Sequence, residues 1–193
     1  MTTEYLLETA ELASATDPLL GLKPGEVIAG QQAINFDFYA VYETKASFTP
    51  FSENQSFQII TVEGESDYAP FGLTNLMTSN YSTLPDQEGN FRFSGNPADL
   101  GLQGEVRSDT FFGRGINKLF GTSSGSGSID FNQGTVSGTG TITITGGQGL
   151  LQGATGTLRF TEMETLADAR GTATVTGDIT VPFPFGGSFI AGL

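Results

Sequence analysis

Hydrophobic and polar positions alternate with a period of two along most of the chain after residue 31. The clearest case is residues 141–145, where threonine and isoleucine alternate without a break. Residues 157–161 and 172–181 repeat the pattern, with one apolar face and one face rich in threonine. Such alternation predicts strands with one buried side. The last third of the chain is therefore predicted to form an antiparallel meander, with turns at intervals of about 10 residues.

Earlier segments predict further strands. In residues 36–43 the apolar side chains of Phe36, Phe38 and Tyr42 share one face, which leaves Glu43 on the other. Four more segments have apolar runs bounded by turn residues: 56–63, 70–82, 91–93 and 105–112. This gives eight to ten strands, which close into a barrel or stack as a sandwich. Glycines inside the strands favour the barrel, so we predict an all-β, antiparallel barrel.

The first 30 residues have a different character. They contain five acidic residues and one lysine. Apolar residues recur at helical spacing, Leu6, Leu7, Ala10 and Ala13, and Asp17-Pro18 would end a helix there. We predict an N-terminal arm over residues 1–30 and a single β-barrel domain over residues 31–193. Because the arm is both acidic and apolar, we expect it to dock on a neighbouring subunit and to make the protein a homo-oligomer.

Composition restricts the function. The 193 residues carry 8 basic and 21 acidic side chains, a formal net charge of −13, which argues against binding of nucleic acid. No apolar run is long enough to span a membrane as a helix, so we expect no membrane insertion. The chain has neither Cys nor His, which excludes thiolate and imidazole metal sites and a Ser-His-Asp triad. We expect neither a metal nor a cofactor.

The segment Ile144-Thr-Gly-Gly-Gln-Gly-Leu-Leu-Gln-Gly-Ala-Thr-Gly156 resembles the T-G-G-x-G-x-F-x-G-A-x-G signature of the allene oxide cyclase barrel. It is also similar to the broad group of bacterial proteins that share this barrel and, more distantly, to dirigent proteins. We interpret it as a hairpin with a tight turn of positive φ at Gly146 and Gly147, where Leu150 or Leu151 closes the barrel end.

The resemblance implies an eight-stranded antiparallel barrel with an apolar cavity, often assembled as a trimer. Val41-Tyr42-Glu43 matches a strand that carries a carboxylate in the plant cyclases, so the resemblance makes Glu43 a catalytic candidate. Lys45 stands where those enzymes have asparagine, and their cavity cysteine has no counterpart in this chain.

Two pairs of carboxylates share a strand face, Glu63 with Glu65 and Glu162 with Glu164. Such pairs could bind a hard cation or perform acid–base chemistry. In an acidic chain some pairs of this kind are expected, and we interpret both as solvated strand ends.

Basic residues concentrate in residues 92–118, the only part of the chain that is not acidic. Arg92, Arg107 and Arg114 alternate there with aromatic residues, Phe93 among them. This pattern favours a site for an apolar ligand that bears a carboxylate. Two alternatives are a patch that pairs with an acidic region of a neighbouring subunit and ordinary surface charge.

Two functions are compatible with these features. The first is a non-enzymatic, self-associating barrel with a structural role, extracellular or at the cell surface, although the N-terminus shows no signal peptide. The second is a barrel that binds a small apolar ligand, or a cyclase or isomerase of the allene oxide cyclase type. We expect the first. An open apolar cavity of about 300 Å³ or more with a few convergent polar groups would favour the second.

Overall fold

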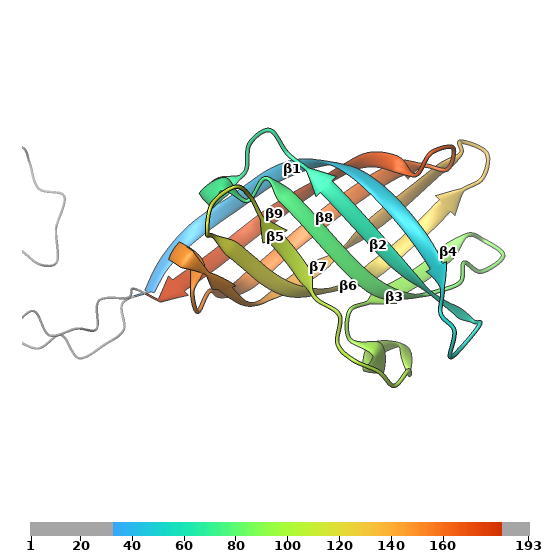
Figure 1. Ribbon diagram of the computed structural model, residues 1–193. Coiled ribbons are helices and arrows are strands. Elements are labelled where there is room, and N and C mark those ends of the chain that lie inside the picture. The colour runs from blue at the N-terminus through green and yellow to red at the C-terminus, as the bar shows by residue number, and fades with distance from the viewer. Residues whose placement is uncertain (1–32, 183–193) are drawn as a thin grey trace, which may run out of the picture. The chain divides into compact units, whose positions relative to one another are not determined.

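The computed structural model describes residues 33–182, and these residues form an antiparallel β-barrel (Figure 1). Three short 3-10 segments interrupt the strands: η1 (Pro70–Gly72), η2 (Pro97–Leu100) and η3 (Gly149–Leu151). The strands are β1 (Ala33–Pro50), β2 (Phe57–Glu65), β3 (Asn75–Thr83), β4 (Asn90–Ser94), β5 (Asp109–Phe112), β6 (Lys118–Asp130), β7 (Thr135–Gln148), β8 (Thr155–Thr165) and β9 (Arg170–Pro182).

The sheet closes into a ring. The strand order is β2-β1-β9-β8-β7-β6-β4-β3, and β2 also pairs with β3. Strands β4 and β5 both lie between β3 and β6, so together they fill one position in the wall. Nine strands therefore make a barrel with eight strand positions, which confirms the prediction of an all-β, antiparallel barrel of eight to ten strands.

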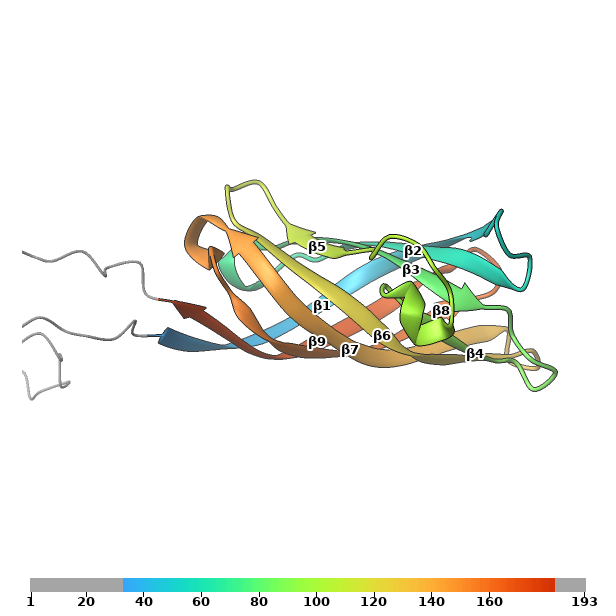
Figure 2. The same cartoon turned by 90° about the horizontal axis from the view of Figure 1, so that it is seen from below.

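Between β4 and β5 the chain leaves the wall and returns. We call residues 95–108 the excursion. It contains η2, the lower of the two short green coils in Figure 1, which lies in front of the strands in Figure 2. Its two ends meet, because the backbone N–H of Arg107 donates to the carbonyl oxygen of Gly95 at 2.8 Å. The N–H of Gly95 in turn donates to the carbonyl of Ser123 on β6, at 2.8 Å. These two hydrogen bonds join the end of β4 to the start of β5 and to β6, so the barrel wall stays continuous where the chain leaves it.

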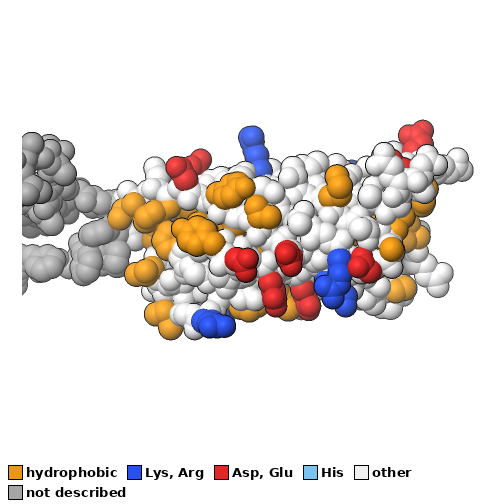
Figure 3. Space-filling model, turned by 90° about the horizontal axis from the view of Figure 1, so that it is seen from above, with side chains coloured by type: hydrophobic (Ala, Val, Ile, Leu, Met, Phe, Trp, Pro, Cys, Tyr) orange, Lys and Arg blue, Asp and Glu red, His pale blue; other side chains and the backbone are white. Residues whose placement is uncertain are grey.

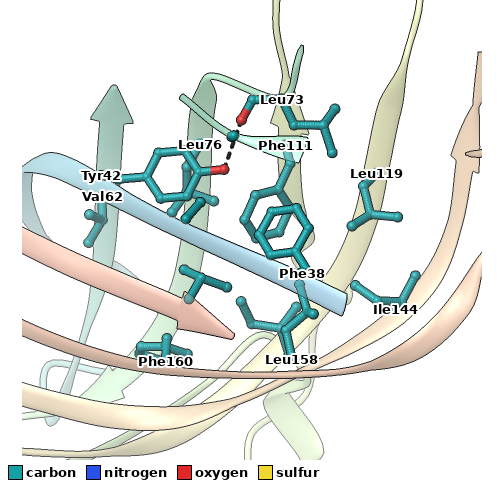
Figure 4. Close-up of a cluster of buried hydrophobic side chains, with 14 of the residues drawn as sticks. Phe38, Tyr42, Val62, Leu73, Leu76, Phe111, Leu119, Ile144, Leu158 and Phe160 are labelled. Carbon is teal, nitrogen blue, oxygen red and sulfur yellow. Dashed lines mark hydrogen bonds between the residues drawn. The ribbon is translucent and has the colours of Figure 1, made fainter. Parts of the chain in front are cut away.

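The predicted inward face of β1 is confirmed. Phe38, Ala40 and Tyr42 are buried, whereas Tyr39 and Glu43 are exposed. The rings of Phe38 and Phe111 meet edge to face at 5.8 Å in the apolar half of the core (Figure 4). The Tyr42 hydroxyl donates to the Leu73 carbonyl at 2.8 Å, and burial raises the pKa of this phenol.

The glycine-rich hairpin differs from the prediction. Strand β7 continues to Gln148, and the turn follows at residues 149–154, where Gly149 and Gly153 have φ of 66° and 73°. Gly146 has a positive φ of 157°, as predicted, whereas Gly147 does not have a positive φ. The predicted turn at Gly146 and Gly147 is therefore wrong by about three residues, because alternation alone does not mark where a strand ends. Leu151 is fully buried and closes this end of the barrel, whereas Leu150 is exposed.

Two predicted strands are shorter than expected. Residues 70–72 form η1, in which Phe71 has φ of 58°, before β3 begins. The segment 105–112 enters the sheet only at Asp109, because residues 105–107 still belong to the excursion.

The predicted arm over residues 1–30 lies outside the described residues, as does the end of the chain after Pro182. Within residues 33–182, no helix has the length and hydropathy needed to cross a membrane.

Candidate functional site

Three carboxyl side chains point into the barrel. Asp109 lies on β5, and Glu162 and Glu164 lie on β8, in the same strand phase as the buried Leu158 and Phe160. Asp109 and Glu164 are 0% and 5% exposed. Interior acids are rare without a paired cation. Among the described residues, no cationic side chain lowers the pKa of any of the three.

The side chain of Asp109 points into the interior at the start of β5, where the excursion rejoins the wall. Its Oδ1 accepts from the hydroxyl of Ser123 at 3.1 Å, and that hydroxyl also lies 3.0 Å from Oδ1 of Asn80. The single proton of Ser123 can serve only one of these two acceptors at a time. Oδ2 of Asp109 is buried and has no hydrogen-bond partner. Burial raises the pKa of Asp109 to about 7, although hydrogen bonds from Ser123 and Thr78 oppose the shift.

Protonation of Asp109 removes the competition of two acceptors for the single proton of Ser123. A protonated carboxyl donates to the Ser123 oxygen, which frees the Ser123 proton for Asn80, and the Asn80 amide already donates to Thr78 at 3.1 Å. Asp109, Ser123 and Asn80 then each donate one hydrogen bond to the next residue in the chain Asp109–Ser123–Asn80–Thr78. The geometry therefore favours the neutral acid.

Glu162 interacts with both of the other interior acids, Glu164 and Asp109. Burial, the charge of Glu164 and the charge of Asp109, in that order, raise the pKa of Glu162 to about 8. Burial raises the pKa of Glu164, whose Oε1 accepts from the Thr44 hydroxyl at 3.2 Å. At neutral pH the interior is thus occupied in part by protonated carboxyl groups, which can donate hydrogen bonds.

A small cavity lies between Asp109 and Glu162. Its volume is about 30 Å³, enough for water but not for an organic ligand. Five polar side chains line it, Thr78, Asn80, Asp109, Ser123 and Glu162, and the remaining lining side chains are apolar: Ile60, Val62, Leu76, Phe93, Ile142, Phe160, Ala173 and Val175.

A larger, open groove of about 810 Å³ crosses β4, β6, β7 and β8. This volume lies in the range of small-molecule sites, roughly 300–1,000 Å³. Its lining combines apolar side chains, hydroxyls and three charged residues: Thr83, Leu84, Asp86, Asn90, Phe91, Arg92, Ser126, Gly127, Ser128, Ser137, Gly138, Thr139, Thr161, Glu162 and Met163. We call this set the groove.

Glu162 lines both spaces. Gly138 is its cross-strand neighbour on β7, and a β-carbon at Gly138 would collide with the Glu162 carboxyl. The absence of a side chain at Gly138 therefore gives Glu162 its place between the groove and the interior cavity.

The residues predicted as a ligand site are dispersed. Arg92 is exposed and lines the groove, whereas Phe93, its neighbour on β4, points inward and lines the cavity. Arg107 lies 4.8 Å from the ring centre of Tyr81 and donates from Nη1 to Ser79 at 2.9 Å. Arg114 is exposed in the loop between β5 and β6. The structure thus brings only Arg92 to the groove and only Phe93 to the cavity.

Glu43, the candidate that the resemblance supplied, is exposed on the outer face of β1. It lies opposite Glu65 on β2 and Thr172 on β9. The strand phase placed it there, because Tyr42 occupies the interior.

The interpretation of Glu162 and Glu164 as solvated was wrong, whereas Glu63 and Glu65 are exposed as expected. Their strand phase was visible in the sequence, since Leu158, Phe160, Glu162 and Glu164 follow at intervals of two. Asp109 had no such signal, because the adjacent Phe111 and Phe112 leave the phase of β5 open. No group of three or more carboxylates among the described residues is placed to hold a metal ion.

No known family model matches the chain, and no curated protein does either. The barrel is similar to the solved structure of a pterocarpan synthase dirigent protein, with 10% sequence identity and a TM-score of 0.43. The match covers 88% of this chain and 99% of that chain. We draw no family or function from this likeness, and membership of the allene oxide cyclase family stays a prediction.

Proposed function

We propose that this protein binds a small organic molecule in the groove, with Glu162 at the inner end of the site. The observation that supports this most directly is the joint position of Glu162, which lines an open groove of about 810 Å³ on one side and a partly polar interior cavity on the other. The volume of the groove lies within the range of small-molecule sites, roughly 300–1,000 Å³.

The lining supplies both parts of a small-molecule site. Leu84, Phe91 and Met163 offer apolar contact, and the hydroxyls of β6, β7 and β8 offer hydrogen bonds. Glu162 places a carboxyl group, which can form hydrogen bonds, at the inner end of the site. Figure 3 shows acidic side chains gathered near the middle of one face.

The test is to fill the groove. Thr139 is exposed on β7 within the groove, and Thr143 is exposed on the same strand outside it. We expect Thr139→Trp to weaken binding of a neutral, polarity-sensitive dye at least tenfold, and Thr143→Trp to leave it unchanged. Circular dichroism should show the same β spectrum for both variants. Equal binding by wild type and Thr139→Trp, or no dye binding by wild type, would contradict the proposal.

Self-association through residues 1–30 is a second proposal, and it rests on composition. These residues carry a net charge of −4 and eight large apolar side chains, which a solvated tail does not need. A structural role, outside the cell or at its surface, is part of this second proposal. Deletion of residues 1–25 should preserve the β spectrum and reduce the mass in solution. An unchanged mass, or a monomeric wild type, would remove this proposal.

A further inference from the structure

The charges that line the groove and its inner end are unequal. The groove itself contains Asp86, Glu162 and one cation, Arg92. Behind Glu162 lie Asp109, across the cavity, and Glu164, two residues along β8. Four acids thus face one base, in a chain whose formal charge is −13.

The interior acids also lack partners that would satisfy their charged forms. Oδ2 of Asp109 is fully buried, lies beside the cavity and accepts no hydrogen bond. Glu162 is destabilised in its charged form by the charges of Glu164 and Asp109. A positive charge placed at Glu162 would reverse this repulsion, because it stabilises every carboxylate around it.

Resting on the proposed function, we infer that the ligand of the groove is an organic cation, an amine with an apolar body whose ammonium group binds Glu162. An ammonium group has three donors and meets the carboxylate of Glu162, while the body lies against Phe91 and Met163. The inferred ligand is therefore positively charged, whereas the pattern of arginines in the sequence favoured a ligand that bears a carboxylate. The negative field of the whole chain attracts such a cation to the groove.

Binding is then coupled to loss of a proton from Glu162. The groups that face Glu162 are Asp109 from β5 and Glu164 from β8, with Asp86 and Arg92 along the groove. An alkylamine keeps its proton to a pH near 10, as a lysine side chain does. Between pH 6 and pH 9 the ligand stays charged while the pKa of Glu162, about 8, is crossed. The affinity for the amine should therefore rise over this interval.

The experiment compares octylamine, octanol and octanoate, which share one body and differ in charge, as competitors of the neutral dye. At pH 9 we expect octylamine to bind at least tenfold more tightly than octanol, and octanoate more weakly than octanol. At pH 6 the advantage of the amine should shrink severalfold. Glu162→Gln should abolish the advantage at both pH values, and Glu63→Gln, an exposed acid on β2, should leave it intact.

The outcomes separate this inference from the proposed function. Tighter binding of octanoate, or an amine preference that survives Glu162→Gln, would overturn the inference while the groove remains a binding site. Failure of the dye and all three competitors to bind would overturn both. Asp109→Asn provides a second variant if Glu162→Gln does not fold, and it should reduce the pH dependence of amine binding.

Discussion

A single side chain, Glu162, acquires its chemistry from its neighbours rather than from its own type. The carboxyl lies over Gly138, between an open groove and a closed cavity, with two other acids nearby. Burial contributes the largest part of its raised pKa, and repulsion by Glu164 and Asp109 adds to it. The same residue on the outer face of the strand would be an ordinary solvated acid.

Gly147 gives a test at this scale. A β-carbon there would lie 2.7 Å from the Lys118 carbonyl oxygen and would also collide with the carbonyl of Leu151. We expect Gly147→Val to lower the free energy of unfolding by about 1–3 kcal/mol, because the backbone must shift to admit the side chain. Urea denaturation measures this.

Gly115→Val is the matched control, since a β-carbon at Gly115 meets nothing within 4 Å and its φ is not positive. It should change stability by less than about 0.5 kcal/mol. Equal stability of Gly147→Val and wild type would show that the hairpin is not close-packed.

At the scale of elements, the broken strand position formed by β4 and β5 is the feature that places the interior acid. The excursion returns at Arg107, two residues before Asp109, and the N–H of Gly95 holds the break against β6. Arg107 over Tyr81 and the hydrogen bond from the Tyr81 hydroxyl to the Glu105 carbonyl, at 3.0 Å, fix the excursion on the outer face of β3.

Removal of the guanidinium should loosen the excursion before it affects the barrel. A cation–π contact is worth about 0.5–1 kcal/mol. We therefore expect Arg107→Ala to speed amide hydrogen exchange in residues 96–106 up to about fivefold, with less change in β6 to β9. The exposed Arg114, substituted by alanine, should leave these rates unchanged. Uniformly faster exchange across the barrel would show that Arg107 stabilises the whole fold instead.

At the scale of the molecule, the interior acids give the barrel an unusual dependence of stability on pH. Asp109 and Glu162 keep a proton in the folded state up to pH values of about 7 and 8. In the unfolded chain they lose it near pH 4. Between these limits the folded state binds more protons than the unfolded state, so the free energy of unfolding falls as the pH rises.

We therefore expect the melting temperature to fall from pH 5 to pH 8. Each acid contributes about 1.4 kcal/mol per pH unit while only its folded form is protonated. Asp109→Asn should flatten the curve up to about pH 7, and Glu162→Gln up to about pH 8. Below pH 4 the lowered pKa values of Asp86 and Asp168 act in the opposite sense. A melting temperature that is constant or rising from pH 5 to pH 8 would contradict the placement of these acids.

The sequence by itself determined the barrel and its inward face. The alternation in residues 36–43, 141–145 and 172–181 fixed which side chains are buried, because successive side chains on a strand point to opposite sides. The same periodicity predicted that Glu43 points outward. The same periodicity also placed Glu162 and Glu164 in the inward phase. Because acids at a strand end are ordinarily solvated, we interpreted them as exposed, and this was wrong.

Only the tertiary structure decided which residues share a site. Ring closure brings β5 opposite β8 and so places Asp109 across a cavity from Glu162, which lies 53 positions further along the chain. The same closure brings Phe93 of β4 and Phe160 of β8 to one cavity, although they lie far apart in the sequence. Local periodicity specifies the direction of each side chain, whereas the pairing of distant strands specifies its neighbours, and charge and burial depend on the neighbours.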